Sequence, residues 1–124
     1  MTSPLILLVH QRVLPGGQLT HRLQDHGYRV QTLADPTTLV EYSLRERPLL
    51  VIIDLAFQTD LVRQAIVELS QNPATNHIPV IAFAPAQESV LLQPEQTPGA
   101  TLTVHDGALL LHLDQLLDQA LQVD

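Results

Sequence analysis

The sequence predicts a three-layer α/β fold, in which a parallel sheet carries helices on both faces. Short apolar runs of strand length alternate with segments whose apolar residues recur every three or four positions. The runs 5–9 and 49–53 are apolar throughout, as in parallel strands that are buried on both faces. With 124 residues, 45% of them hydrophobic, the chain is long enough for one packed core. We therefore expect a single domain over residues 1–124, excised from a larger multidomain protein.

The first part of the chain is expected to form a strand, a helix and a second strand. Residues 5–9 are the first strand, and Pro15 opens a helix that continues to about His26. Gly27 follows at the position where a left-handed residue ends a helix. Residues 28–33 alternate between the two faces of a strand, with tyrosine, valine and threonine on one side. This alternation indicates a half-exposed strand at an edge of the sheet.

A second helix and a central strand are expected next. Asp35 and Pro36 suit the N-cap and first position of a helix that continues to Pro48. The third strand is the apolar run that ends in Asp54. The apolar positions expected to carry the second helix are Leu39, Tyr42 (or Val40) and Leu44.

The second half of the chain continues the alternation. A third helix is expected from about Gln58 to Ser70, followed by a fourth strand at 78–83 and a short fifth strand at 99–104. The pattern weakens between Pro85 and Pro98, so any helix there is short. The third helix should bury Leu61, Val62, Ala65, Ile66 and Leu69. A last helix from Asp106 or Gly107 should bury Leu109, Leu110, Leu113, Leu116, Leu117, Ala120 and Leu121.

The composition excludes several classes of function. The six basic residues are all arginine, against 13 Asp and Glu, and the formal charge is −7. A negative chain is a poor ligand for nucleic acids and anionic membranes, because such binding neutralises phosphates. Cysteine is absent, which excludes disulfides, thiol catalysis and zinc–cysteine sites. No apolar run approaches the roughly 20 residues of a membrane span, and we expect a cytoplasmic location.

Several local signatures, taken in order, resemble the response-regulator receiver domains. Arg47–Asp54 resembles the receiver's third strand with its leading proline, and Asn72–Pro73 through Ile78–Ile81 resembles the approach to the fourth. Gly99–Ala100 resembles the dipeptide that introduces the fifth strand. The resemblance covers essentially the whole chain. It implies a flavodoxin-like or receiver-like sheet of order 2-1-3-4-5 with helices on both faces.

The positions that carry receiver chemistry depart from the family pattern. Receivers place two acidic residues after the first strand to hold Mg²⁺, and here His10 and Gln11 stand there. The Ser or Thr that ends the fourth strand is Ala84, and no lysine follows the fifth strand. Asp54 alone matches, so it is interpreted as a vestigial phospho-acceptor position that caps a nearby amide or is solvated. The chain thus resembles a degenerate pseudo-receiver without enzymatic activity. A phospho-accepting receiver that uses Asp54 is the alternative.

A narrower likeness is to the C-terminal pseudo-receivers of the cyanobacterial circadian input kinases, the CikA family. It rests on the Gln- and Leu-rich, lysine-free character of the chain. Membership implies docking to the clock protein KaiB, regulation of a parent histidine kinase and sensing of quinones as redox reporters. No cofactor is expected, apart from a quinone as a possible ligand.

The second strand is the candidate partner-binding surface. In the receiver order this strand lies at an edge of the sheet, where one row of backbone groups is unpaired. A partner strand can add to such an edge, and alternate side chains then set the specificity. Protection of the edge by Arg29 and neighbouring loops is the other interpretation. The candidate residues are Tyr28, Arg29, Val30, Gln31, Thr32 and Leu33.

Three further candidates have weaker support. His10, Asp54 and His105 are a conceivable transition-metal set at the carboxyl ends of the strands, but they lack any tight spacing motif, so no metal site is expected. Residues 90–92 could present an apolar surface to a hydrophobic ligand such as a quinone. A flavodoxin-like nucleotide site is disfavoured, because Pro15–Gly17 is too short for a phosphate-binding loop.

Overall fold

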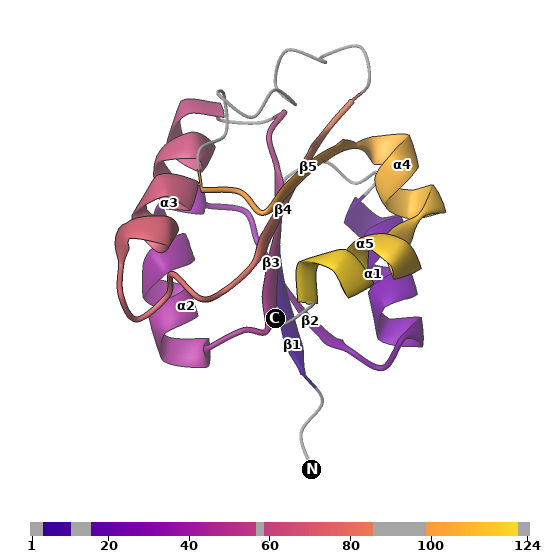
Figure 1. The fold of residues 1–124 in the computed structure, drawn as a ribbon, viewed down its shortest axis with the longest axis horizontal. Helices are drawn as coiled ribbons and strands as arrows, with labels where there is room; N and C mark the ends of the chain where they lie inside the picture. The colour runs from indigo at the N-terminus through magenta and orange to yellow at the C-terminus, as the bar shows by residue number, and fades with distance from the viewer. Residues whose placement is uncertain (1–3, 11–15, 57–58, 86–98, 122–124) are drawn as a thin grey trace.

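The computed structural model describes residues 4–10, 16–56, 59–85 and 99–121. Within these ranges five strands form one parallel sheet of order β2-β1-β3-β4-β5, and helices cover both of its faces (Figure 1). The predicted three-layer α/β fold and its strand order are confirmed.

The elements follow one another in strict α/β order. The strands are β1 (Leu5–Val9), β2 (Arg29–Leu33), β3 (Leu50–Asp54), β4 (Val80–Ala84) and β5 (Leu102–His105). The helices are α1 (Gly16–Asp25), the 3-10 turn η1 (Pro36–Thr38), α2 (Leu39–Glu46), α3 (Thr59–Gln71), α4 (Asp106–Leu111) and α5 (Leu113–Leu121).

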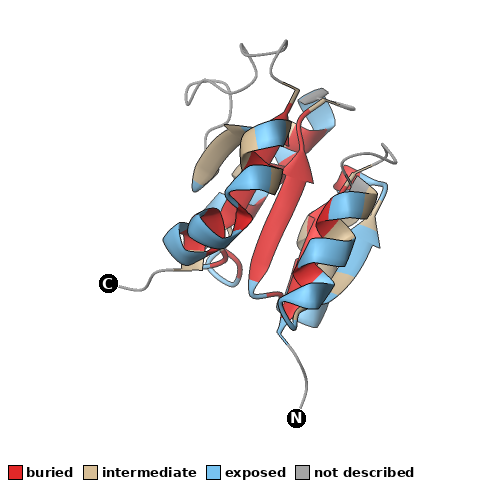
Figure 2. Ribbon diagram, turned by 90° about the vertical axis from the view of Figure 1, so that its right-hand side faces the viewer, coloured by how far each residue is buried: buried red, intermediate tan, exposed pale blue. Residues whose placement is uncertain are grey.

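The sheet separates two apolar cores. The α2–α3 core lies on one face, and the α1–α5 core lies on the other face beneath α1, α4 and α5. Every residue of β1, β3 and β4 is buried, because these strands have neighbours on both sides and helices above and below. Figure 2 shows the central strands as buried, whereas much of β2 is exposed at the edge. The continuous apolar runs therefore form buried central strands, and the alternating run forms a partly exposed edge strand, as predicted.

Local signals place most element boundaries. Gly27 has a φ of +89° after α1, as expected of a residue that ends a helix. The Asp35 side chain accepts a hydrogen bond from the Thr37 amide at 3.0 Å, so Asp35 is an N-cap as predicted. The helix begins as the short η1 turn. It ends at Glu46, where Arg47 has a left-handed conformation with φ 49°.

Two leucines point outward: Leu44, expected among the apolar positions of the second helix, and Leu61, expected on the inner stripe of the third. Leu44 is 42% exposed and Leu61 is 41% exposed. In α2 the buried positions are Leu39 and Ser43, one full turn apart, and this spacing rotates Leu44 away from the sheet. In α3 the remaining four predicted residues, Val62, Ala65, Ile66 and Leu69, are buried as expected.

The last helix is interrupted where we expected a continuous one. His112 separates α4 from α5 and has φ −116° and ψ 30°, outside the helical range. Leu109 and Leu113 are nevertheless both buried, while Leu111 is 77% exposed. Residues 86–98 lie outside the described part of the chain, and they include the candidate ligand residues 90–92. In the described ranges no helix has the length and apolar character needed to cross a bilayer.

Candidate functional site

Asp54 ends β3 at the carboxyl edge of the sheet, as predicted, and it is fully buried. Its Oδ1 accepts a hydrogen bond from the Ala56 amide at 2.8 Å. An aspartate that binds the amide two residues ahead stabilises a turn. The carboxylate therefore caps the Ala56 amide at the end of β3, and the vestigial status of Asp54 stays a prediction.

His10 directly follows β1, one residue after a position that is paired with β3. Val9 lies opposite Ile53, so His10 follows at the level of Asp54. The His10 amide donates to the Leu33 carbonyl at 2.9 Å, which continues the β1–β2 ladder. Mg²⁺ prefers oxygen ligands, and an imidazole at this position supplies none. Gln11 lies outside the described residues.

His105 ends β5 and begins the following helix. Its Nδ1 accepts a hydrogen bond from the Ala108 amide at 3.1 Å, so the ring caps α4. This contact requires a lone pair on Nδ1. Beside it in the sheet is Ala84, which carries no hydroxyl. The ends of β4 and β5 thus carry an alanine and a helix-capping imidazole side by side.

The three residues of the conceivable metal set do not converge. Asp54 ends β3 and His105 ends β5, and β4 lies between these strands. Within the described ranges no group of three or more His, Cys, Asp or Glu side chains could hold a metal ion.

The second strand lies at an edge of the sheet, as the sequence predicts. In the described part of the chain β2 pairs with β1 alone. The Arg29 amide donates to the Pro4 carbonyl at 2.8 Å, and the Leu33 carbonyl accepts from His10 at 2.9 Å. Successive residues of a parallel strand direct their backbone groups to opposite sides. Val30 and Thr32 therefore direct their amides and carbonyls away from β1, toward the open edge.

One of these outward groups already has a partner from β2 itself. The Gln31 side chain donates to the Thr32 carbonyl at 3.3 Å. The side chains of Tyr28 and Val30 pack on the α1–α5 core, and Leu33 packs on the α2–α3 core. Arg29, Gln31 and Thr32 are exposed, and Tyr28 precedes the strand. The edge is thus a short strand with an exposed polar surface and two outward-facing residues.

Two exposed ionisable groups have shifted pKa values. The Asp114 carboxylate on α5 raises the pKa of His26 above its ordinary value, with further contributions from the Arg22 carbonyl and Asp25. His26 contacts Asp114 through Nε2 and the Arg22 carbonyl through Nδ1 at 2.8 Å. Since both partners accept, the two contacts together require the doubly protonated ring. The Thr37 hydroxyl and amide lower the pKa of Asp35.

A cavity at the opposite, amino end of the sheet was missed from the sequence. It has a volume of about 590 Å³ and lies between the end of α2, the start of β4 and α5. Its walls combine residues more than 100 positions apart, so no sequence pattern marks it. The only local signal is Arg47–Pro48, an abrupt helix end without glycine.

Comparisons with solved structures give one consistent result. A protein described as a response regulator from Chloroflexus aurantiacus has a TM-score of 0.85 at 16% identity, over 97% of this chain and 98% of its own. The receiver domain of a sensor histidine kinase from Pseudomonas aeruginosa, with magnesium coordinated in its active-site cleft, has a TM-score of 0.81 at 20% identity, over 97% and 98%. A receiver domain of a histidine kinase from Syntrophus aciditrophicus has a TM-score of 0.74 at 22% identity, over 98% and 96%.

The similarity is in the fold. No protein-family model matches the chain, and no curated protein matches it either. The chain has the fold of receiver domains. Whether it also has their chemistry depends on the side chains at the carboxyl edge of the sheet.

Proposed function

We propose that this chain is a receiver-like signalling module that acts by binding a partner protein and does not transfer phosphoryl groups. The observation that supports the proposal is the carboxyl edge of the sheet. There Asp54, the carboxylate that ends β3, is buried and bonded to the Ala56 amide, and the ends of β1, β4 and β5 carry His10, Ala84 and His105.

Phosphoryl transfer needs more charge than this edge supplies. A phospho-acceptor must be reached by the phosphoryl donor, and metal ions or cationic side chains must neutralise the charge that develops on the phosphoryl oxygens. Receivers meet this need with two further acidic residues and a lysine. The present sequence contains no lysine and has no acidic residue before Asp25. One buried carboxylate is a weak Mg²⁺ site on its own.

The β2 edge is the proposed docking surface. Val30 and Thr32 offer two amides and two carbonyls toward solvent, and one of the carbonyls is bonded to Gln31. At roughly 0.5–1.5 kcal/mol per hydrogen bond, a partner strand gains about 1.5–4.5 kcal/mol from the three remaining groups. Because association costs at least about 4 kcal/mol, side-chain contacts must supply the rest. Exposed Arg29 favours a partner strand with an acidic residue opposite it.

The likeness to circadian pseudo-receivers suggests the partner. On that basis we propose a KaiB-like clock protein as the ligand of the β2 edge, and regulation of a parent histidine kinase in the cytoplasm as the outcome. Quinone sensing belongs to the same proposal. Its candidate residues, 90–92, lie outside the described part of the chain.

Two substitutions in β2 test the docking surface by NMR titration with a purified KaiB-like protein. Val30→Pro removes an outward amide, and we expect it to weaken binding at least about tenfold while the fold is retained. Gln31→Ala frees the Thr32 carbonyl, and we expect unchanged or tighter binding. Gln31→Pro is the matched control for the strand assignment. It removes an amide bonded to β1 and should lower the unfolding free energy by about 1–3 kcal/mol. Unchanged affinity in folded Val30→Pro refutes the docking surface.

The phospho-accepting alternative is tested with Mg²⁺ and beryllofluoride or acetyl phosphate. Under the proposal, the amide spectrum shows no saturable shifts around Asp54, and Asp54→Asn behaves as the parent chain does. Shifts centred on Asp54 that disappear in Asp54→Asn would overturn the non-catalytic assignment.

A further inference from the structure

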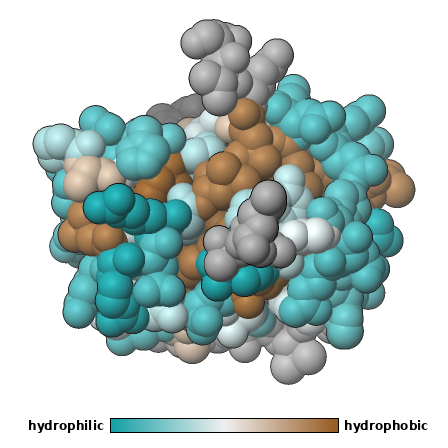
Figure 3. All heavy atoms as spheres, turned by 90° about the horizontal axis from the view of Figure 1, so that it is seen from below, coloured by the Kyte–Doolittle hydropathy of each residue, from teal (hydrophilic) through white to brown (hydrophobic). Residues whose placement is uncertain are grey.

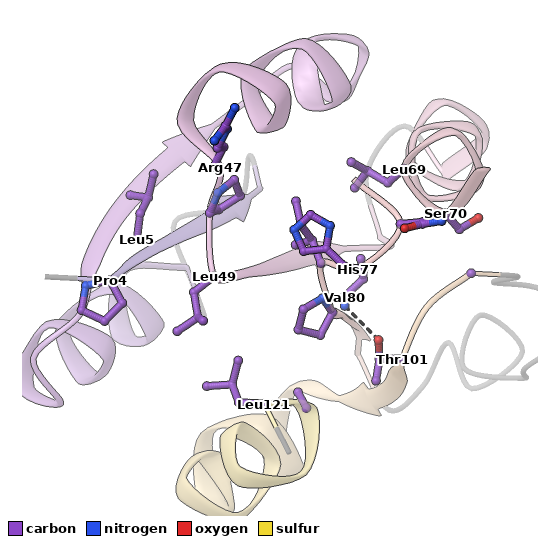
Figure 4. A pocket seen from close by; sticks show the side chains of 16 residues that line it. Pro4, Leu5, Arg47, Leu49, Leu69, Ser70, His77, Val80, Thr101 and Leu121 are labelled. Atoms are coloured by element: carbon purple, nitrogen blue, oxygen red, sulfur yellow. Dashed lines mark hydrogen bonds between the residues drawn. The ribbon is translucent and has the colours of Figure 1, made fainter. Parts of the chain in front are cut away.

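The cavity at the amino end of the sheet has the size of a small-molecule site. Its volume of about 590 Å³ falls within the range of roughly 300–1,000 Å³ that is typical of ligand pockets. Figure 3 shows this underside of the molecule, where hydrophobic side chains gather in the centre and polar ones surround them. In the close view, Arg47 lies at the end of α2, His77 lies near the middle beside Val80, and Leu121 lies on α5 (Figure 4).

Arg47 has an unusual backbone at this cavity. It is the one non-glycine residue with positive φ in the described part of the chain, at φ 49° and ψ 63°. A left-handed non-glycine residue is strained, and such strain is concentrated at functional sites. The neighbouring Arg45 guanidinium lies 4.6 Å from the centre of the Tyr42 ring and 3.6 Å from Glu46. No such ion pair or ring contact holds the Arg47 guanidinium among the described residues.

A second cavity adjoins the first at the same two polar residues. It has a volume of about 480 Å³ and shares Arg47, His77 and Ile78 with the larger one. Ser43 also lines it, and the buried Ser43 hydroxyl has no hydrogen-bond partner in the described part of the chain. Arg47 and His77 therefore stand at the junction of two cavities.

The charge at this junction is opposite to that of the whole molecule. The chain has a formal charge of −7, yet no Asp or Glu among the described residues lines either cavity. An arginine whose charge is not balanced by an acidic neighbour attracts a carboxylate, and two parallel hydrogen bonds can hold it. The apolar walls at Leu49, Val80 and Leu121 complement an aliphatic or aromatic body.

We propose that the amino-end cavity binds a small amphipathic carboxylic acid. The carboxylate of the ligand is held by Arg47 and His77, and its apolar body occupies the space between Leu49, Val80 and Leu121. The site is at the opposite end of the sheet from Asp54 and is separate from the outward groups of β2. It therefore goes beyond the proposed partner-binding function, and Val30→Pro should leave it unchanged.

The experiment is an amide NMR titration with octanoate, with octanol and acetate as probes of the two halves of the ligand. We expect saturable shifts of Leu49, Val80 and Thr101 with octanoate at about 1 mM, as befits a ligand of about ten heavy atoms. Octanol should bind more weakly, and acetate should cause no saturable shift of these amides. Arg47→Gln should weaken octanoate binding at least about tenfold, because it removes a charged hydrogen-bond donor. Arg45→Gln is the matched control and should bind octanoate as the parent chain does.

Three results overturn the proposal. One is the absence of saturable shifts at these amides. Another is equal octanoate affinity in a folded Arg47→Gln variant. The third is a change of the same amides with protein concentration alone, which would make the cavity part of an interface between two copies of the chain.

Discussion

Replacing Arg47 by glycine should stabilise this protein, although it removes a side chain from the surface. Arg47 ends α2 with φ 49° and ψ 63°, the conformation in which helices usually place glycine. Its amide donates to the Ser43 carbonyl at 2.9 Å, and glycine keeps this hydrogen bond. The substitution therefore relieves backbone strain without loss of a backbone contact.

The expected gain follows from two opposing terms. A left-handed conformation costs a non-glycine residue roughly 1–2 kcal/mol. Glycine at the same position loses about 0.5–1 kcal/mol more conformational entropy on folding. The net stabilisation is about 0–1.5 kcal/mol, with a middle value of about 0.75 kcal/mol. With a urea m-value of about 1–3 kcal/mol/M for a domain of this size, this middle value should raise the unfolding midpoint by roughly 0.25–0.75 M.

Two companion variants separate backbone strain from side-chain effects in the same urea titration. Arg47→Ala removes the guanidinium but keeps the strain, so its midpoint should stay close to that of the parent chain. Arg45→Gly, within α2, should lower the unfolding free energy by about 1 kcal/mol and loses the contact with the Tyr42 ring. If Arg47→Ala gains as much as Arg47→Gly, the stabilisation comes from the lost charge and the strain argument is wrong.

Three other variants give further tests, each by urea unfolding. Ile66→Ala should lower the unfolding free energy by about 2–5 kcal/mol because Ile66 is fully buried. Leu61→Ala should lower it by less than about 1 kcal/mol because Leu61 is exposed. The reverse order would mean that the face of α3 with Leu61 is the buried one. The pair of His26 and Asp114 should contribute less than about 1 kcal/mol because both side chains are exposed. The pKa of His26 in the folded protein is raised above 6.5, so this contribution to stability is fully present below about pH 6.5 and is lost as the pH rises through the folded pKa. If the unfolding free energy of Asp114→Asn keeps the same dependence on pH, Asp114 is not the cause of the raised pKa. Ser43→Ala should be neutral or stabilising, since it removes a buried hydroxyl that has no hydrogen-bond partner among the described residues, and a loss of more than about 1 kcal/mol of unfolding free energy would show that the hydroxyl is bonded.

The strands of this fold are predictable because each has a distinct apolar pattern. The continuous run 5–9 became β1, buried on both faces, and the alternating run 28–33 became the half-exposed edge strand β2. Turn chemistry was equally informative. Gly27 and Asp35 end and begin helices for local steric and hydrogen-bonding reasons that do not depend on the rest of the chain.

The features that the sequence does not predict depend on distant neighbours. Apolar spacings of three and four are the same on both sides of the break at His112, so the spacing cannot reveal the interruption. Leu44 and Leu61 are apolar and therefore resemble residues of a buried helix face, but only part of each helix packs against the sheet, and both leucines lie outside that part. The position of Asp54 was predictable, and its complete burial was not, because burial depends on the strands and turns around it.

The division of the core by the sheet has a consequence for the order in which the chain can fold. The buried residues of the α2–α3 core all lie between positions 5 and 84. The α1–α5 core joins Leu19 and Leu23 of α1 to residues as late as Ala120. During synthesis, the first core can therefore close while the second still lacks one wall, because domains are made from the N-terminus onward. The same asymmetry predicts that amide hydrogens of α1 and α5 exchange together, as one cooperative unit, before those of β3 and β4.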